Sequence, residues 1–171
     1  MNTPKVPESQ FHSYFKQYIN LVEDVPIDKA LTSGMERATE FYKTLSEDNW
    51  FYKYAEGKWT PKEVFLHSID TERIFCYRAL QVARSNNPIL SGFDENLFVE
   101  NSNANERSVA DLIREYTSTR KATIALFKSF SDETMNKTGV ANEKPLSVQA
   151  AGYIICGHEL HHINIIKERY L

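Results

Sequence analysis

The chain has 171 residues, of which 42% are hydrophobic and 25% charged, as in soluble globular proteins. Its length favours one domain, over residues 1–171. A net charge of -3 without a Lys/Arg-rich run argues against a nucleic-acid-binding surface, and no window approaches the roughly 18 apolar residues of a membrane span. The first residues lack the apolar core of a secretion signal, so we expect a cytoplasmic protein that binds neither nucleic acid nor membrane.

Four long segments have the apolar spacing of helices, and no strand pattern competes with them. The second of these has the clearest start, because Thr60 can cap it, Pro61 suits its first position and Glu63 completes a capping box. A short amphipathic segment, 11–21, precedes the first. The four predicted helices are at about 27–45, 60–84, 108–130 and 147–171.

The predicted fold class is all-α, a four-helix bundle. A connection of about twenty residues is expected between the second and third helices, and connections of that length are usually functional or partly structured. A polar loop, 131–146, is expected before the fourth helix.

The histidines of the fourth helix are the most informative residues. His158 and His162 are four residues apart and so lie about 40° apart on one helix face, in the apolar stripe expected to face the bundle interior. His161 lies about 60° to the other side of His158. Side chains spaced in this way can bind one metal ion.

A third ligand is expected from another buried face. His67 shares the apolar stripe of the second helix and is the obvious candidate, whereas His12 lies on a less certain segment. An isolated buried histidine is more often a hydrogen-bonded core residue. Three buried imidazoles are costly unless their nitrogens are satisfied, and one metal ion satisfies them together. The pattern therefore predicts a metal site.

Two other metal sites are disfavoured. Residues 158–162 match the H-E-x-x-H motif of zinc proteases, with Glu159 as the general base, but few residues follow His162 to supply the usual third ligand. A di-iron site needs two Glu-x-x-His pairs. Glu159 and His162 form one, whereas Glu63 and His67 are one residue too far apart.

The chain resembles the DinB-like superfamily, also called the DinB/YfiT-like metalloenzymes. The segments that carry the resemblance follow the family's order and span nearly the whole sequence: 57–64, 67–73, 77–80, 92–96 and 157–162.

This resemblance implies a four-helix bundle in which His67, His158 and His162 hold a divalent metal, most often zinc or nickel and in some cases iron or manganese. It also implies a homodimer and a small-molecule substrate. Characterised relatives include transferases and isomerases that use low-molecular-weight thiols, and many others are described as metal-dependent hydrolases.

Two reactions are therefore open. Three neutral ligands leave a coordination position free, so metal-bound water can attack an ester or amide, or a thiol can bind there as thiolate. The alternative is a metal-binding stress or regulatory module without turnover.

Residues around the predicted ligands supply further candidates. Glu159, Asp70 or His161 is expected to orient an imidazole or relay a proton, although a solvated or helix-pairing carboxylate is the simpler interpretation of the acids. Inward arginines need a partner, so Arg78 and Arg120 are expected to pair with a carboxylate such as Asp94. Binding of a substrate carboxylate by Arg78 is the alternative. Trp59 and Phe93 are expected to pack the ends of the bundle.

Overall fold

Four long helices lie side by side in the computed structural model, which describes residues 6–86 and 88–171. The predicted four-helix bundle is confirmed, and its boundaries lie close to those expected. None of the described helices is long and apolar enough to span a bilayer. The bundle helices are α2 (Ile27–Lys43), α4 (Pro61–Arg84), α6 (Val109–Lys128) and α8 (Val148–Arg169).

The start of α4 has the predicted capping box. The Thr60 hydroxyl accepts a hydrogen bond from the Glu63 backbone N–H, and the Glu63 carboxylate accepts one from the Thr60 N–H at 2.7 Å. These bonds satisfy backbone groups that the first helical turn leaves without partners. Pro61 follows at the first helical position, where no N–H is needed.

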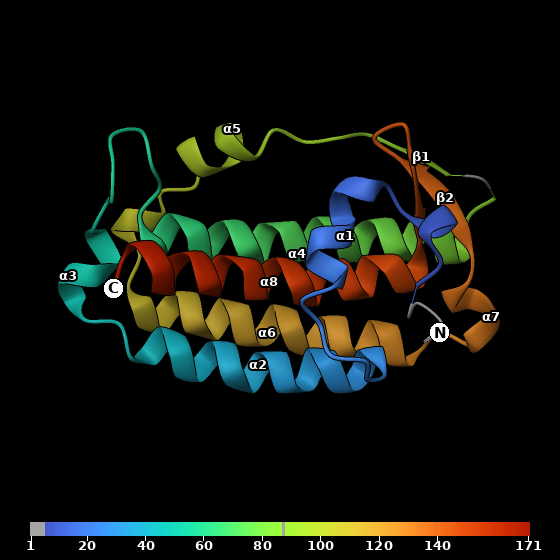
Figure 1. Ribbon diagram of the computed structural model, residues 1–171, viewed down its shortest axis with the longest axis horizontal. Helices are drawn as coiled ribbons and strands as arrows, with labels where there is room; N and C mark the ends of the chain where they lie inside the picture. The colour runs from blue at the N-terminus through green and yellow to red at the C-terminus, as the bar shows by residue number, and fades with distance from the viewer. Residues whose placement is uncertain (1–5, 87) are drawn as a thin grey trace.

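Consecutive helices of the bundle do not simply alternate in direction. Figure 1 shows α2 and α8 running one way and α4 and α6 running the other way. Because α4 and α6 are parallel, the chain must return along the length of the bundle between them. Residues 85–108 make this return and contain strand β1 (Ile89–Leu90), helix α5 (Glu95–Glu100) and a 3-10 turn, Ala104–Glu106.

A small sheet lies at one end of the bundle, although no strand was predicted. β2 (Thr138–Ala141) and β3 (Lys144–Ser147) form an antiparallel hairpin, and β1 pairs with β2 in parallel. Asn142 and Glu143 turn the hairpin with positive φ angles of 50° and 61°. Strands this short give too few alternating positions for a sequence pattern to be recognised.

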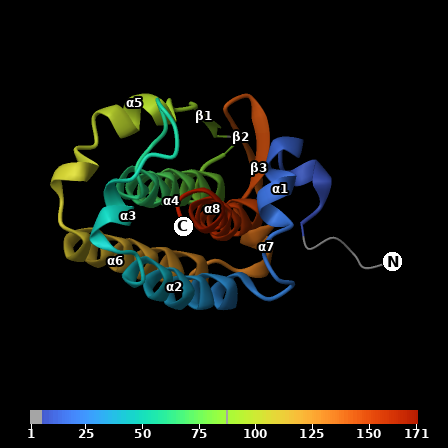
Figure 2. The ribbon, with the colours of Figure 1, turned by 60° about the vertical axis from the view of Figure 1, so that its left-hand side comes forward.

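The remaining described elements are short. They are the α-helices α1 (Lys16–Ile19), α3 (Glu47–Phe51) and α7 (Asp132–Met135) and the 3-10 turns Glu8–Gln10 and Ser13–Phe15. Figure 2 shows α4 and α8 as one layer and α6 and α2 as the other, with α1 and the hairpin beside α8 and with α5 outside α4. The additional elements therefore cover the α4 and α8 layer.

A buried charged cluster separates two apolar cores. One core contains Phe75 and Ile154, and the other contains Phe65 and Ile163. Between them Arg120 of α6 donates to both carboxylate oxygens of Glu72 on α4, at 2.9 and 2.8 Å, and to Glu159 on α8 at 2.7 Å. Further bonds complete the cluster: the Tyr116 hydroxyl donates to Glu159 at 2.5 Å, and Thr123 donates to Glu72 at 2.6 Å.

Gly34 on α2 leaves the space that this cluster occupies. A Cβ atom there would lie 3.0 Å from both the Arg120 guanidinium and the Glu159 carboxylate. All four long helices therefore meet at the charged cluster. Three contribute side chains, and α2 contributes the space at Gly34 and the Leu31 carbonyl, which accepts a hydrogen bond from Arg120 Nη1 at 3.3 Å.

Replacing Arg120 by Ala should lower the free energy of unfolding by about 3–5 kcal/mol, because the substitution leaves two buried carboxylates without their shared cation. Denaturant titration of the purified variant measures the change. The triple variant with Glu72→Gln, Arg120→Met and Glu159→Gln should recover part of the loss. A single variant as stable as the wild type would contradict this role for the cluster.

Candidate metal site

The predicted site lies between α4 and α8, on their covered outer face rather than in the centre of the bundle. His67 comes from α4, and His158 and His162 come from α8. Tyr18 of α1 packs its ring edge-to-face on His158, with centroids 5.4 Å apart. Within the same turn of α8, Glu159 points instead to the charged cluster. The expectation that the histidine stripe faces the bundle interior is therefore wrong, because α8 is buried on several sides.

The three imidazoles converge through their Nε2 atoms. His158 Nε2 lies 3.1 Å from His67 Nε2 and 3.0 Å from His162 Nε2. The potential ligand atoms of all three lie within 4.8 Å of one another. Nitrogens 2.0–2.1 Å from a tetrahedral zinc ion are about 3.3 Å apart, so this arrangement fits one divalent metal.

The charge state of the imidazoles also fits a metal. Burial lowers the pKa of His67 to about 4. Burial, reinforced by the neighbouring histidines, holds the pKa values of His158 and His162 well below their ordinary value. All three are neutral at pH 7, and only a neutral imidazole has the lone pair that binds a metal.

A cavity of about 580 Å³ opens over the three histidines, and all five histidines of the chain line it. Its floor is formed by α4 and α8. Its other walls come from the N-terminal segment, Trp59, residues 92–95 at the start of α5 and the β2–β3 hairpin, and no lining residue comes from α2 or α6. The volume suits a small organic ligand.

The matched family model is described as the DinB superfamily and covers residues 30–166. The chain belongs to the DinB superfamily. A solved structure, YfiT from Bacillus subtilis, has 16% sequence identity and a TM-score of 0.71, over 95% of this chain and 89% of that chain. That protein is described as a probable metal-dependent hydrolase with an unusual four-helix bundle topology. No curated protein matches this chain.

At this identity the similarity to YfiT shows a shared fold. The match of the family model to a stretch that reaches into all four long helices explains why the resemblance could be recognised from the sequence. The metal-ligand roles of His67, His158 and His162 in this DinB protein stay predictions, supported by their convergence.

The two predicted acidic neighbours lie elsewhere in this DinB protein. Glu159 belongs to the charged cluster, and Asp70 pairs with Arg73 at 3.3 Å near the surface. Among the described residues, no hydrogen bond joins either carboxylate to a histidine. The structure thus gives both acids the helix-pairing role considered as the simpler interpretation.

The arginines differ from the expected pairing with Asp94. Arg120 pairs with Glu72 and Glu159. Asp94 caps α5 by accepting hydrogen bonds from the backbone N–H groups of Asn96 and Leu97. The expected partner was wrong because the capping role of Asp94 could not be distinguished from an ion pair by sequence alone.

Aromatic and histidine side chains form much of the cavity wall. Trp59 packs on His67 with ring centroids 4.9 Å apart, and Phe93 also lines the cavity. The expectation that both pack only the bundle ends is therefore wrong. His161 packs against Tyr18 and His162 beside the three converging nitrogens.

Neither cysteine lines this cavity. Burial raises the pKa of Cys76 to about 11 and that of Cys156 to about 12, and both thiols are free. Because the thiolate is the nucleophile, these residues are unsuited to covalent chemistry at neutral pH.

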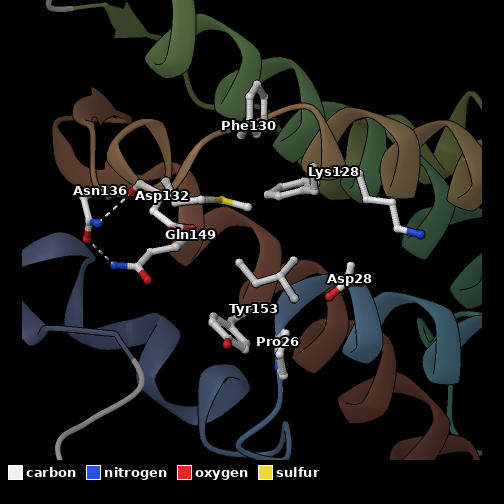
Figure 3. A pocket seen from close by; sticks show the side chains of 11 residues that line it. Pro26, Asp28, Lys128, Phe130, Asp132, Asn136, Gln149 and Tyr153 are labelled. Atoms are coloured by element: carbon white, nitrogen blue, oxygen red, sulfur yellow. Dashed lines mark hydrogen bonds between the residues drawn. The ribbon is translucent and has the colours of Figure 1, made fainter.

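A second cavity, of about 490 Å³, lies at the α7 end of the bundle (Figure 3). Gln149 donates there to Asn136, which in turn donates to the Asp132 carbonyl. None of its lining residues is a histidine or a cysteine. Among the described residues, the three histidines are the one group of three or more side chains that could hold a metal ion.

Gly157 allows α1 to approach the three converging histidines. A Cβ atom at this position would lie 2.0 Å from the Tyr18 carbonyl oxygen, so the backbone of α1 rests directly on α8. The contact places the Tyr18 ring against His158. This role of Gly157 and Tyr18 was not predicted, because helical phase gives no information about a segment packed from outside the bundle.

Gly157→Ala should displace α1 and destabilise the protein, despite a gain in helix propensity of about 1 kcal/mol. Limited trypsin digestion should show faster cleavage after Lys16, which lies on α1. Unchanged cleavage and unchanged thermal stability would contradict the close approach.

The metal-free protein should become less stable as pH falls from about 6.5 toward 4. The folded pKa of His67 is lowered to about 4, whereas an unfolded histidine titrates near 6.5, so the unfolded state binds more protons in this window. The contribution of neutral His67 to the free energy of unfolding is complete above about pH 6.5, the pKa of an unfolded histidine. It is lost as the pH falls toward about 4, the pKa of His67 in the folded protein. Denaturant titrations at pH 7, 6 and 5 measure the slope. His67→Leu should reduce it, and an equal slope would contradict the assignment.

Proposed function

We propose that this protein is a metal-dependent hydrolase of small molecules, with His67, His158 and His162 binding zinc or nickel. The observation that carries the proposal is the convergence of three neutral imidazoles, two buried and that of His162 half-buried, on one point at the floor of a cavity. The description of YfiT as a probable metal-dependent hydrolase supports the same class of activity.

The three neutral histidine ligands favour a catalytic role for the metal over a structural one. Three neutral ligands leave the charge of a divalent ion uncompensated, and structural zinc sites usually have four protein ligands. When bound, the metal would supply a Lewis acid that polarises a carbonyl group and lowers the pKa of water or of a thiol.

The protein side chains would orient the ligands and restrict water. Trp59 packs on His67, and Tyr18 packs on His158 and His161. These aromatic contacts limit rotation of the imidazoles and make part of the cavity wall apolar. A substrate is thereby held in a partly dry site, where electrostatic interactions are stronger than in water.

Thiol transfer is the second candidate, and it uses the same three ligands. The sulfur would have to come from a low-molecular-weight thiol, since the two cysteines of the chain do not line the cavity. The homodimer and the cytoplasmic location expected from the sequence stay predictions.

Elemental analysis after metal reconstitution tests the site. Wild-type protein should bind one divalent ion per chain, and His162→Ala should lose stoichiometric binding because one ligand is missing. His12→Ala is the matched control and should retain the metal, since His12 lines the cavity outside the converging group. Stoichiometric binding by His162→Ala would overturn the ligand assignment.

Turnover is then assayed on the same preparations. A panel of p-nitrophenyl esters and a thiol-conjugation assay, each with and without a chelator, separate hydrolysis from thiol transfer. Chelator-sensitive ester cleavage supports the hydrolase, and chelator-sensitive conjugation alone supports the transferase. Bound metal with no activity in either assay would identify a metal-binding module.

A further inference from the structure

Arg78 is a buried cation in the wall of the histidine cavity. Arg78 is 5% exposed and lines the cavity. Its guanidinium donates one hydrogen bond, from Nη2 to the Ser91 carbonyl oxygen at 2.9 Å, and lies 5.0 Å from the Phe75 ring centroid. No carboxylate among the described residues pairs with it. Arginine has five N–H donors, so most of its hydrogen-bonding capacity is unused.

This arrangement is unfavourable unless a ligand completes it. A buried charge normally requires an opposite charge and several hydrogen bonds. Burial lowers the pKa of Arg78. The two carboxylate partners of Arg120 instead raise its pKa, although Arg120 is the more completely buried of the two arginines. The two inward arginines of the chain thus have opposite environments, one fully paired and one open to a cavity.

Thr71 is a second unpartnered polar group in the same wall. The residue is 4% exposed and lines the cavity. Its Oγ1 atom has no hydrogen-bond partner among the described residues. A buried hydroxyl without a partner costs about 1–3 kcal/mol, so this atom also fits a site that a ligand completes.

The two groups are aligned with the metal site along one helix. His67, Thr71, Phe75 and Arg78 all lie on α4 and all line the cavity. At 1.5 Å per residue, Arg78 is about 16 Å along the helix from His67, and Thr71 lies between them. Along this face of α4, a ligand in the cavity would meet the candidate metal ligand His67, then a hydroxyl, an aromatic ring and a cation, in that order.

We propose that the cavity binds an elongated monocarboxylate, with Arg78 binding the carboxylate and Thr71 hydrogen-bonding a polar group in the middle of the chain. The reacting end of the ligand would then lie beside His67, a step that rests on the proposed metal-dependent function. The guanidinium carbon of Arg78 lies 5.0 Å from the Phe75 ring centroid and 5.9 Å from that of Phe93, which is within the range of cation–π attraction.

The charges of the cavity favour a carboxylate over a phosphate. Arg78 is the one buried cation among the described lining residues, and Lys144 is exposed. Glu95 adds a negative charge to the same cavity. One guanidinium matches one negative charge in planar, bidentate geometry, whereas a phosphate dianion would be left partly uncompensated.

Calorimetric titration with 6-acetamidohexanoate tests the proposal, because this probe has a carboxylate at one end and an amide near the other. N-hexylacetamide, which lacks the carboxylate, should bind at least about 10-fold more weakly, as expected for the loss of a charged hydrogen bond. Arg78→Gln should weaken binding of the carboxylate probe by about 10- to 100-fold and leave binding of N-hexylacetamide unchanged.

Matched variants separate recognition from folding. Arg84→Gln removes an exposed arginine from the same helix and should leave both affinities unchanged. Thr71→Val keeps the shape of the side chain and should lower the affinity for 6-acetamidohexanoate more than the affinity for octanoate. The melting temperature of the ligand-free variant should equal or exceed that of the wild type.

Each titration is performed on metal-reconstituted and on metal-free protein, with metal content measured in every sample. Carboxylate binding that requires Arg78 in the metal-free protein supports the proposal even if the hydrolase assignment fails. Equal affinity for the two probes, or unchanged affinity in Arg78→Gln, would overturn it. Binding lost only on metal removal would show that the carboxylate binds the metal instead. Tighter binding of octyl phosphate than of octanoate would identify phosphate as the preferred anion.

Discussion

The charged cluster of Glu72, Arg120 and Glu159 is the constraint on which the arrangement of the bundle depends. It joins α4, α6 and α8 and requires a glycine on α2. Because buried ion pairs tolerate little displacement, the cluster fixes the rotation of α4 and α8 about their axes. That rotation directs Glu159 inward and His158 outward, and it brings His67 within 3.1 Å of His158.

Helical phase predicted that the three histidines converge, because the relevant positions lie on long, regular helices. His158 and His162 share a face at any rotation of α8, and His67 needs only to face them. Helical phase could not show which element packs against the face of α8 that carries His158 and His162. α8 is buried from residue 150 to residue 159, so its apolar surface has no single stripe and the histidine face could not be distinguished from the bundle-facing side by hydrophobicity.

The charged cluster itself could not be predicted for a related reason. The sequence predicted that Arg120 faces the interior of the bundle. Which acidic residue it pairs with depends on how far α4, α6 and α8 are shifted along their axes relative to one another. Asp94 was the example of a partner expected from the sequence, and Glu72, which is buried on α4, was not considered. A carboxylate inside an otherwise apolar helical segment is a stronger signal for a buried ion pair than one at a helix start, where capping gives it a local role.

The cavity could not be predicted from helical phase, because only part of its lining lies on long helices. Its floor comes from regular helices, whereas its walls come from residues near 12–18, 92–95 and 141–146, segments with short helices, short strands and turns. Parallel α4 and α6 force the chain back along the bundle, and this return places Phe93 and Ser91 beside Arg78. The bundle topology therefore determines more than the fold: it supplies the wall around Arg78, which has no carboxylate partner among the described residues.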